Sequence, residues 1–134
     1  MSRKLEDLRP EFRVLVDPWL AACQAEHDDL IITCTLRTME EQAILYAQGR
    51  TTPGHIVTRA KPGQSAHNYG LAIDIVPIVA GKLVWDEENP LWQKIGHLGM
   101  DHGLIWYGAP NVSFHEDPHF EMPHWREVAG VKTV

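Results

Sequence analysis

The sequence predicts an α+β fold, with helices packed on one side of a mostly antiparallel sheet. Three observations lead to this fold class. Apolar residues recur at helical spacing near the N-terminus, and short runs rich in β-branched residues follow. The expected order of elements is helix, strand, helix, long loop, hairpin, helix and two strands, which suits helices set against one sheet. A length of 134 residues fits a single domain, 1–134, with one core.

The first element is a helix over residues 10–26. Its apolar stripe follows helical spacing and consists of Phe12, Leu15, Val16, Trp19, Leu20 and Cys23. Pro18 lies off this stripe, and it either kinks the helix or restarts it with Asp17 as the N-cap.

A strand over residues 30–36 leads directly into a second helix. Thr38 and Glu41 have the spacing of a capping box, and Gly49 ends the helix. The expected buried face of this helix consists of Met39, Ala43, Leu45 and Tyr46. The segment 50–66 is a long loop, and loops of this length in compact domains are often functional.

The second half of the chain supplies a hairpin, a third helix and two more strands. Residues 71–79 form the strongest strand candidate, and a turn at 80–82 pairs it with residues 83–85. Asn89 and Pro90 begin a helix that runs to about His102 and is closed by Gly103. Residues 104–107 and 118–122 are the last expected strands.

Composition excludes several classes of function. The formal net charge of −6 gives no electrostatic footprint for nucleic acid. No apolar stretch approaches the roughly 20 residues of a membrane-spanning helix, and no apolar signal-peptide segment follows the basic N-terminus. Cys23 and Cys34 are expected to be buried thiols, although a disulfide between them is compatible with the sequence.

Two histidines and an aspartate have the chemistry of a zinc site. Asp74 lies inside the apolar run 71–79, where a carboxylate is unfavourable unless it is paired or binds a metal. Gly70 permits a bend that could bring His67 and Asp74 to one ion. His119 is the best third ligand, and Glu116 could take a proton from a zinc-bound water. The alternative is that both histidines are ordinary polar residues and Asp74 is salt-bridged.

The motif SxHxxGxAxD, filled by Ser65, His67, Gly70, Ala72 and Asp74, resembles that of the VanY/VanX-type D,D-peptidases. The chain looks most similar to the phage L-alanyl-D-glutamate endopeptidases of that superfamily. Further similar segments include 35–38, 45–50, 103–106 and 117–121. The resemblance implies the hedgehog/D,D-peptidase-like fold and a single catalytic domain without a separate wall-binding domain.

Carried over to this chain, the resemblance implies Zn²⁺ held by His67, Asp74 and His119. It places the general base on Glu116, with Asp117 or Glu121 as candidates to share that role. Arg37 would hold a substrate carboxylate or the oxyanion, although a surface ion pair with Glu40 or Glu41 is the simpler interpretation of this residue. Expected substrate contacts come from Ser65, Gln42, Trp106 and His115.

The resulting function is a zinc metallopeptidase that cuts peptidoglycan stem peptides, acting as a phage or prophage endolysin. A D-alanyl-D-alanine carboxypeptidase is the nearer alternative, and a non-catalytic zinc-bearing binding module is an alternative of another class. Without a signal peptide, the protein is expected to be made in the host cytoplasm and to act on the cell wall after release by a holin-like partner. It is expected to be a monomer without stable membrane insertion.

Overall fold

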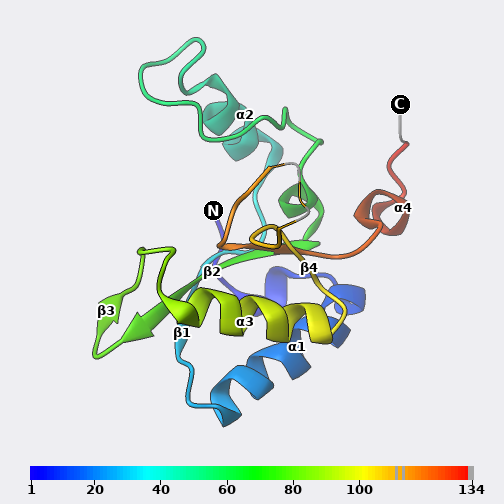
Figure 1. Cartoon of the computed structure of the whole chain (residues 1–134). Coiled ribbons are helices and arrows are strands. Elements are labelled where there is room, and N and C mark those ends of the chain that lie inside the picture. Colours follow the sequence, from blue (N-terminus) through cyan, green and yellow to red (C-terminus); the bar gives the residue numbers. More distant parts are fainter. Residues whose placement is uncertain (111, 113, 133–134) are drawn as a thin grey trace.

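The computed structural model describes residues 1–110, 112 and 114–132 (Figure 1). The elements, in chain order, are η1 (Leu5–Asp7), α1 (Pro10–Ala25), β1 (Leu30–Cys34), α2 (Met39–Ala47), η2 (Ala66–Tyr69), β2 (Ala72–Val79), β3 (Lys82–Leu83), α3 (Pro90–Asp101), β4 (Ile105–Trp106), β5 (His119–Glu121) and α4 (Trp125–Ala129). Every helix in the described part of the chain is too short or too polar to cross a membrane.

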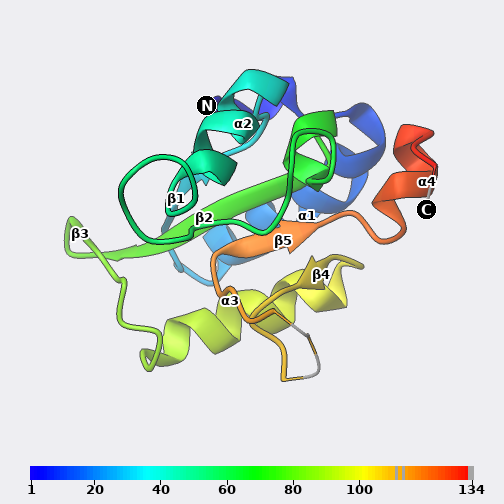
Figure 2. The same cartoon turned by 90° about the horizontal axis from the view of Figure 1, so that it is seen from above.

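The strands form one antiparallel sheet in the order β1-β2-β5-β4, and β3 pairs with the far end of β2. Helices α1 and α3 lie side by side against one face of this sheet, whereas α2, η2 and the long loop lie beyond the other face (Figures 1 and 2). The predicted α+β fold class is therefore confirmed. The face that the long helices leave uncovered carries the polar residues described below.

The core lies between the sheet and the two long helices. The predicted stripe of α1 is buried at Phe12, Val16, Trp19 and Cys23. Trp19 packs against Phe120 of β5 with ring centroids 4.3 Å apart. Helix α3 can approach strand β5 closely because Gly99 has no side chain. A Cβ at this position would lie only 2.7 Å from the Phe120 ring. The close packing of α1 and α3 against one face of the sheet fixes the positions of the central strands. This favours a well-defined arrangement of side chains on the other face.

Helix α1 is continuous through Pro18, so the helix does not restart at Asp17. The side chains of Pro18 and Val14 are both exposed. The carbonyl of Val14, which loses its helical partner to the proline, is therefore on the solvent side, where water can satisfy it.

The expected buried face of α2 is wrong. Met39 and Ala43 are exposed, Leu45 and Tyr46 are half-buried, and Gln42 is the buried residue of this helix. The capping box itself is present, with Glu41 N donating to Thr38 Oγ1 and Thr38 N donating to Glu41 Oε1. The periodicity argument failed because the buried side of α2 faces the long loop, where the Gln42 amide donates to Ala60 O, and does not face the apolar core.

Strand ends differ from the prediction by at most two residues. Strand β1 ends at Cys34 rather than at residue 36, because its register shifts between Ile32 and Cys34 before the chain turns into α2. Strand β4 contains only Ile105 and Trp106. The short helices η2 and α4 were not predicted, and η2 is the element that carries His67.

Candidate metal centre and active site

Two of the predicted ligands face each other across neighbouring strands. Asp74 of β2 and His119 of β5 are register partners, so their side chains leave the same face of the sheet. Asp74 Oδ1 lies 3.1 Å from His119 Nδ1. The flanking residues Ile73 and Phe120 point to the opposite face and are fully buried in the core.

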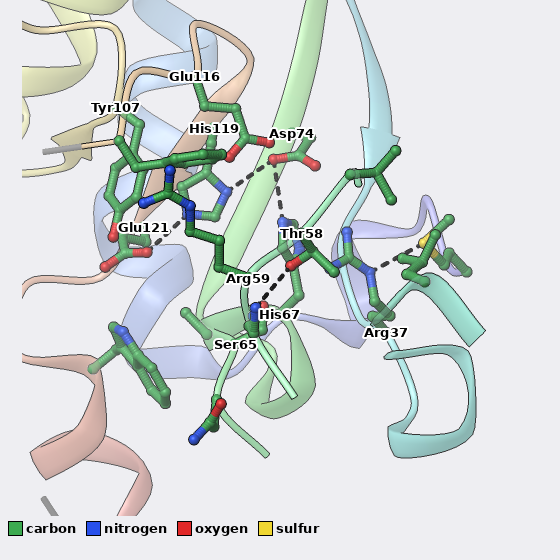
Figure 3. A pocket seen from close by; sticks show the side chains of 18 of the residues that line it. Arg37, Thr58, Arg59, Ser65, His67, Asp74, Tyr107, Glu116, His119 and Glu121 are labelled. Atoms are coloured by element: carbon green, nitrogen blue, oxygen red, sulfur yellow. Dashed lines mark hydrogen bonds and ion pairs between the residues drawn. The ribbon is translucent and has the colours of Figure 1, made fainter. Parts of the chain in front are cut away.

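The third predicted ligand, His67, comes from η2, the turn that precedes β2. Ser65 caps this turn, with its hydroxyl accepting from His67 N, and Gly70 closes it in the left-handed region at φ 68°. A side chain at Gly70 would also meet Asp7 O at 2.9 Å. This geometry brings His67 Nε2 to 3.1 Å from Asp74 Oδ1. Figure 3 shows both imidazoles converging on the same carboxylate.

The outer nitrogen of each ring is already occupied by an acceptor. His67 Nδ1 donates to Thr35 O at 2.8 Å, and His119 Nε2 donates to Glu121 Oε1 at 2.8 Å. Because these protons are held on the outer nitrogens, loss of the second proton from each ring leaves a lone pair on His67 Nε2 and on His119 Nδ1, the nitrogens that lie next to Asp74. Such outer hydrogen bonds are usual for metal-ligating histidines. Two imidazole nitrogens that each lie 3.1 Å from the same carboxylate oxygen offer the kind of donors that a divalent metal ion such as zinc binds.

Cys34 also lies near this centre, with Sγ 3.6 Å from His67 Nδ1. One ligand atom from each of Cys34, His67 and Asp74 lies within 4.8 Å of the other two. However, the thiol approaches the ring nitrogen that faces Thr35 and not the one that faces Asp74. His119 is therefore the better third ligand. Cys23 and Cys34 are both free and buried, so the disulfide left open by the sequence does not form in the structure.

Electrostatics couple the three side chains. Burial alone would lower the pKa of His67, but the charge of Asp74 and hydrogen bonds to Asp74 and Cys34 outweigh burial and raise the pKa to about 10. Burial opposes the charged form of His119 as well, yet hydrogen bonds to Asp74 and Glu121 raise its pKa to about 9. Burial would raise the pKa of Asp74, but the imidazoles hold it well below its usual range. In the absence of metal the site thus binds protons that a cation would displace.

Glu116 extends from the segment before β5 toward Asp74 (Figure 3). Its backbone is fixed on both sides, since Glu116 N donates to Tyr107 O and His119 N donates to Glu116 O. Burial raises the pKa of its carboxyl above the usual range, and the charge of Asp74 adds to this, whereas the two histidines and Arg37 oppose it. A carboxylate placed here can exchange a proton with a molecule in the site.

The two other carboxylates considered as bases have different environments. Glu121 is nine-tenths buried and accepts the hydrogen bond from His119, so it orients a ring. Asp117 is buried and does not lie among the described residues that line the cavity around Asp74. The geometry therefore favours Glu116 over both.

The cavity next to these residues has a volume of about 360 Å³. Three arginines line it, namely Arg37, Arg59 and Arg126, together with Ser65, Glu116 and Tyr107. Tyr107 packs edge-on against His119 with ring centroids 4.5 Å apart. Burial, and then the charge of Glu121, raises the pKa of Tyr107 to about 12, so its hydroxyl stays protonated at neutral pH.

Arg37 lines the cavity and is held by Gln42. Arg37 Nη1 donates to Gln42 Oε1 at 2.9 Å, and the Gln42 amide donates to Ala60 O at 2.8 Å. Glu41 instead pairs with the N-terminal ammonium group. Among the described residues Arg37 forms no ion pair with Glu40 or Glu41, so the simpler surface-pair interpretation does not describe this structure.

Three of the tentative substrate contacts are placed away from the cavity. Gln42 is fully buried behind Arg37, and Trp106 is buried in the core with its Nε1 donating to Asp117 O at 2.7 Å. His115 is exposed and lies beside Asp117. Of the four tentative substrate contacts, only Ser65 is among the described residues that line the cavity.

The sequence interpretation did not assign roles to Arg59 and Arg126, and it considered Glu121 only as a base. For Glu121 a signal was present, because a residue two positions from His119 in a strand must share its face. For Arg59 and Arg126 the sequence contained no such signal. Their positions at the cavity depend on the path of the long loop and on helix α4, which was not predicted.

Similarity to known proteins extends over most of the chain. The family model for the M15-type D-alanyl-D-alanine carboxypeptidase matches residues 58–122. The chain is 37% identical, over 124 residues, to the peptidoglycan L-alanyl-D-glutamate endopeptidase CwlK of Bacillus subtilis (strain 168), covering 87% of this chain and 74% of that relative.

Two solved structures share the fold. The L-Ala D-Glu endopeptidase ChiX of Serratia marcescens superposes with a TM-score of 0.65 at 20% identity, covering 93% of this chain and 86% of that one. The vancomycin-resistance D,D-pentapeptidase VanY, in complex with Zn(II), superposes with a TM-score of 0.64 at 16% identity, covering 92% and 80% of the two chains.

Proposed function

Because the chain belongs to the peptidase M15 family of peptidoglycan hydrolases, we propose that it is a zinc-dependent L-alanyl-D-glutamate endopeptidase. The family resemblance predicted from the sequence is confirmed, and with it the assignment as an enzyme. The zinc, the bond cut and the residue roles are proposals, and the following observations support them.

One observation carries the proposal. His67 Nε2 and His119 Nδ1 each lie 3.1 Å from Asp74 Oδ1. The other nitrogen of each ring donates a hydrogen bond, to Thr35 O and to Glu121 Oε1 respectively, and these bonds fix the ring orientations. His67, Asp74 and His119 would hold the ion. When bound, zinc supplies a Lewis acid for the scissile carbonyl and lowers the pKa of a coordinated water.

Glu116 would act as the general base and then as the general acid. Its carboxylate lines the cavity beside Asp74, so it can take a proton from the attacking water. The water oxygen then forms the new bond to the carbonyl carbon, and Glu116 passes the proton to the amine nitrogen as the peptide bond breaks. The raised pKa of Glu116 suits this double role, because the group must be able to hold the proton between the two steps.

The three arginines would bind an anionic peptide. A stem peptide that contains D-glutamate carries a free carboxylate next to the bond to be cut, and a guanidinium can bind a carboxylate through two parallel hydrogen bonds. Arg37 is preset by Gln42, whereas Arg59 and Arg126 stack on Phe114 and Trp125 at the rim. This charge distribution supports a carboxylate-bearing substrate.

The bond is best tested with purified muropeptides. The 37% identity to an L-alanyl-D-glutamate endopeptidase supports the endopeptidase assignment, whereas the description of the matching family model favours a D-alanyl-D-alanine carboxypeptidase. Digestion with and without a chelator, followed by mass spectrometry, separates the two. New N-terminal D-glutamate supports our proposal, and released D-alanine supports the alternative.

The endolysin role is a further part of the proposal, and it rests on the similarity to the phage endopeptidases described above. Expression in a Gram-negative host with and without a holin tests it. Lysis only when the holin is present is the expected result, and lysis without a holin would contradict the need for a release partner.

A further inference from the structure

A second cluster of metal-ligand side chains lies outside the proposed active site. It consists of Glu87, from the segment before α3, and of His115 and Asp117, from the segment between β4 and β5. One ligand atom from each residue lies within 4.8 Å of the other two. None of the three is among the described residues that line the active-site cavity.

The Asp117 carboxylate is an unusual member of this cluster. Asp117 is only 2% exposed, and its Oδ1 accepts no hydrogen bond from the described residues. Leaving a buried carboxylate oxygen without a partner is unfavourable. The group is held there firmly, because Trp106 Nε1 donates to the Asp117 carbonyl and Gly108 leaves room for the side chain.

The nearest described partner of this oxygen is the imidazole of His115, which forms an ion pair with it only when the ring is protonated. His115 Nε2 lies 2.6 Å from Asp117 Oδ1, but the contact lacks the alignment of a hydrogen bond. Within the described ranges, Glu87 and Asp117 form no ion pair with a lysine or arginine. Glu87 and Asp117 bring two carboxylates into the cluster, and one divalent cation would neutralise their charge.

From these observations we propose that Glu87, His115 and Asp117 form a second divalent-cation site. A nitrogen and two oxygen donors suit a first-row ion such as Zn²⁺ or Mn²⁺ better than Ca²⁺, which prefers oxygen ligands alone. Water would complete the coordination, since Glu87 and His115 are both exposed.

The location of this site gives it a role in the reaction. His115 and Asp117 flank Glu116, whose carboxylate faces the active-site cavity. A cation bound on the outer side would tie the Glu116 segment to the segment that leads into α3. It would therefore act as a positioning site, and this role rests on the proposed function of Glu116, whereas the binding itself does not.

Zinc titration of chelator-treated protein tests the binding. The wild type is expected to bind two equivalents by isothermal titration calorimetry, and His67→Ala and His115→Ala one equivalent each, at different sites. Glu87→Gln should weaken the second site by at least about tenfold. The adjacent exposed Glu88 provides the matched control, and Glu88→Gln should leave both sites unchanged.

The outcomes discriminate clearly. A wild type whose single equivalent is retained in His115→Ala, or a His115→Ala variant that still binds two, overturns the proposal, whereas a single equivalent that is lost in His115→Ala would instead leave the proposed active site without metal. His115 is exposed, so circular dichroism should show that this variant folds. If the role is also correct, His115→Ala retains its first zinc and its KM while kcat falls. Because stoichiometry does not depend on turnover, it tests this site even if the protein proves to cut another bond.

Discussion

Asp74 Oδ1 lies 3.1 Å from His119 Nδ1, across the register pair that joins β2 to β5. Asp74 Oδ1 also contacts His67 Nε2, which comes from the turn before β2. Asp74 therefore links the two histidines of the proposed metal centre. The sheet therefore sets the distance between ligands that are 45 residues apart in sequence.

Asp74→Asn should abolish stable zinc binding. The amide keeps the shape of the side chain but removes the charge that faces both imidazoles, so metal affinity and wall lysis should both be lost. Elemental analysis after dialysis measures the zinc content, and Asp17→Asn at an exposed position of α1 is the matched control. Full zinc content in Asp74→Asn would remove Asp74 from the proposed ligand set.

Glu116→Gln should retain zinc and lose turnover. The amide fills the same space next to Asp74 but cannot accept and return the proton, so kcat should fall by about 10²- to 10⁴-fold with little change in KM. Steady-state kinetics on purified muropeptides gives the split between the two constants. Glu127→Gln, on the exposed face of α4, should behave as the wild type. Unchanged kcat in Glu116→Gln would exclude Glu116 as the base.

Glu121 variants should form a graded series. Glu121→Ala leaves His119 Nε2 without its acceptor, so zinc affinity should fall by about 10- to 100-fold. Glu121→Gln should lose less, because the amide oxygen can still accept that hydrogen bond. Competition with a fluorescent chelator measures both affinities. An equal loss in the two variants would show that the charge of Glu121, and not the hydrogen bond, matters.

Gln42→Leu should weaken both the fold and substrate binding. The substitution removes the acceptor for Arg37 Nη1 and the donor to Ala60 O, which costs about 1–3 kcal/mol in the free energy of unfolding. KM should rise because the Arg37 guanidinium is no longer fixed. Urea denaturation and muropeptide kinetics are the measurements, with the exposed Gln24→Leu as control. Normal KM in a destabilised Gln42→Leu would limit Gln42 to a structural role.

The ligand set could be proposed from the sequence because its geometry is local or follows from strand pairing. His67 and Asp74 lie seven positions apart around Gly70, and an acidic residue inside an apolar strand demands a partner. The position of His119 opposite Asp74 follows once β2 and β5 are paired. The sequence did not predict that pairing, since a strand of three residues, His119–Glu121, has too little periodicity to reveal it, and the resemblance to the D,D-peptidases implied only the ligand role of His119.

The surroundings of the site could not be predicted in the same way. Helical periodicity assumes that a helix covers the core, and this assumption failed for α2, where the buried residue is Gln42. Trp106 was expected to contact substrate, but its ring is buried against Gly96 of α3. A Cβ on Gly96 would lie 2.4 Å from this ring, so the glycine makes room for it in the core. Such placements depend on contacts between distant segments, which single-sequence patterns do not contain.

Chelation should lower the thermal stability of the protein reversibly. A ligand that binds only the folded state stabilises it by about 2.7 kcal/mol at a free concentration one hundred times its Kd, so removing the metal should lower Tm by several degrees. Differential scanning calorimetry with a chelator, and after return of excess zinc, measures the change. His67→Ala should show a much smaller shift, because it lacks the nitrogen donor that faces Asp74. The shift that remains in this variant is expected to come from metal bound by Glu87, His115 and Asp117. The double variant His67→Ala/His115→Ala should then show no shift at all, and a full shift in that variant would place the stabilising metal elsewhere in the protein.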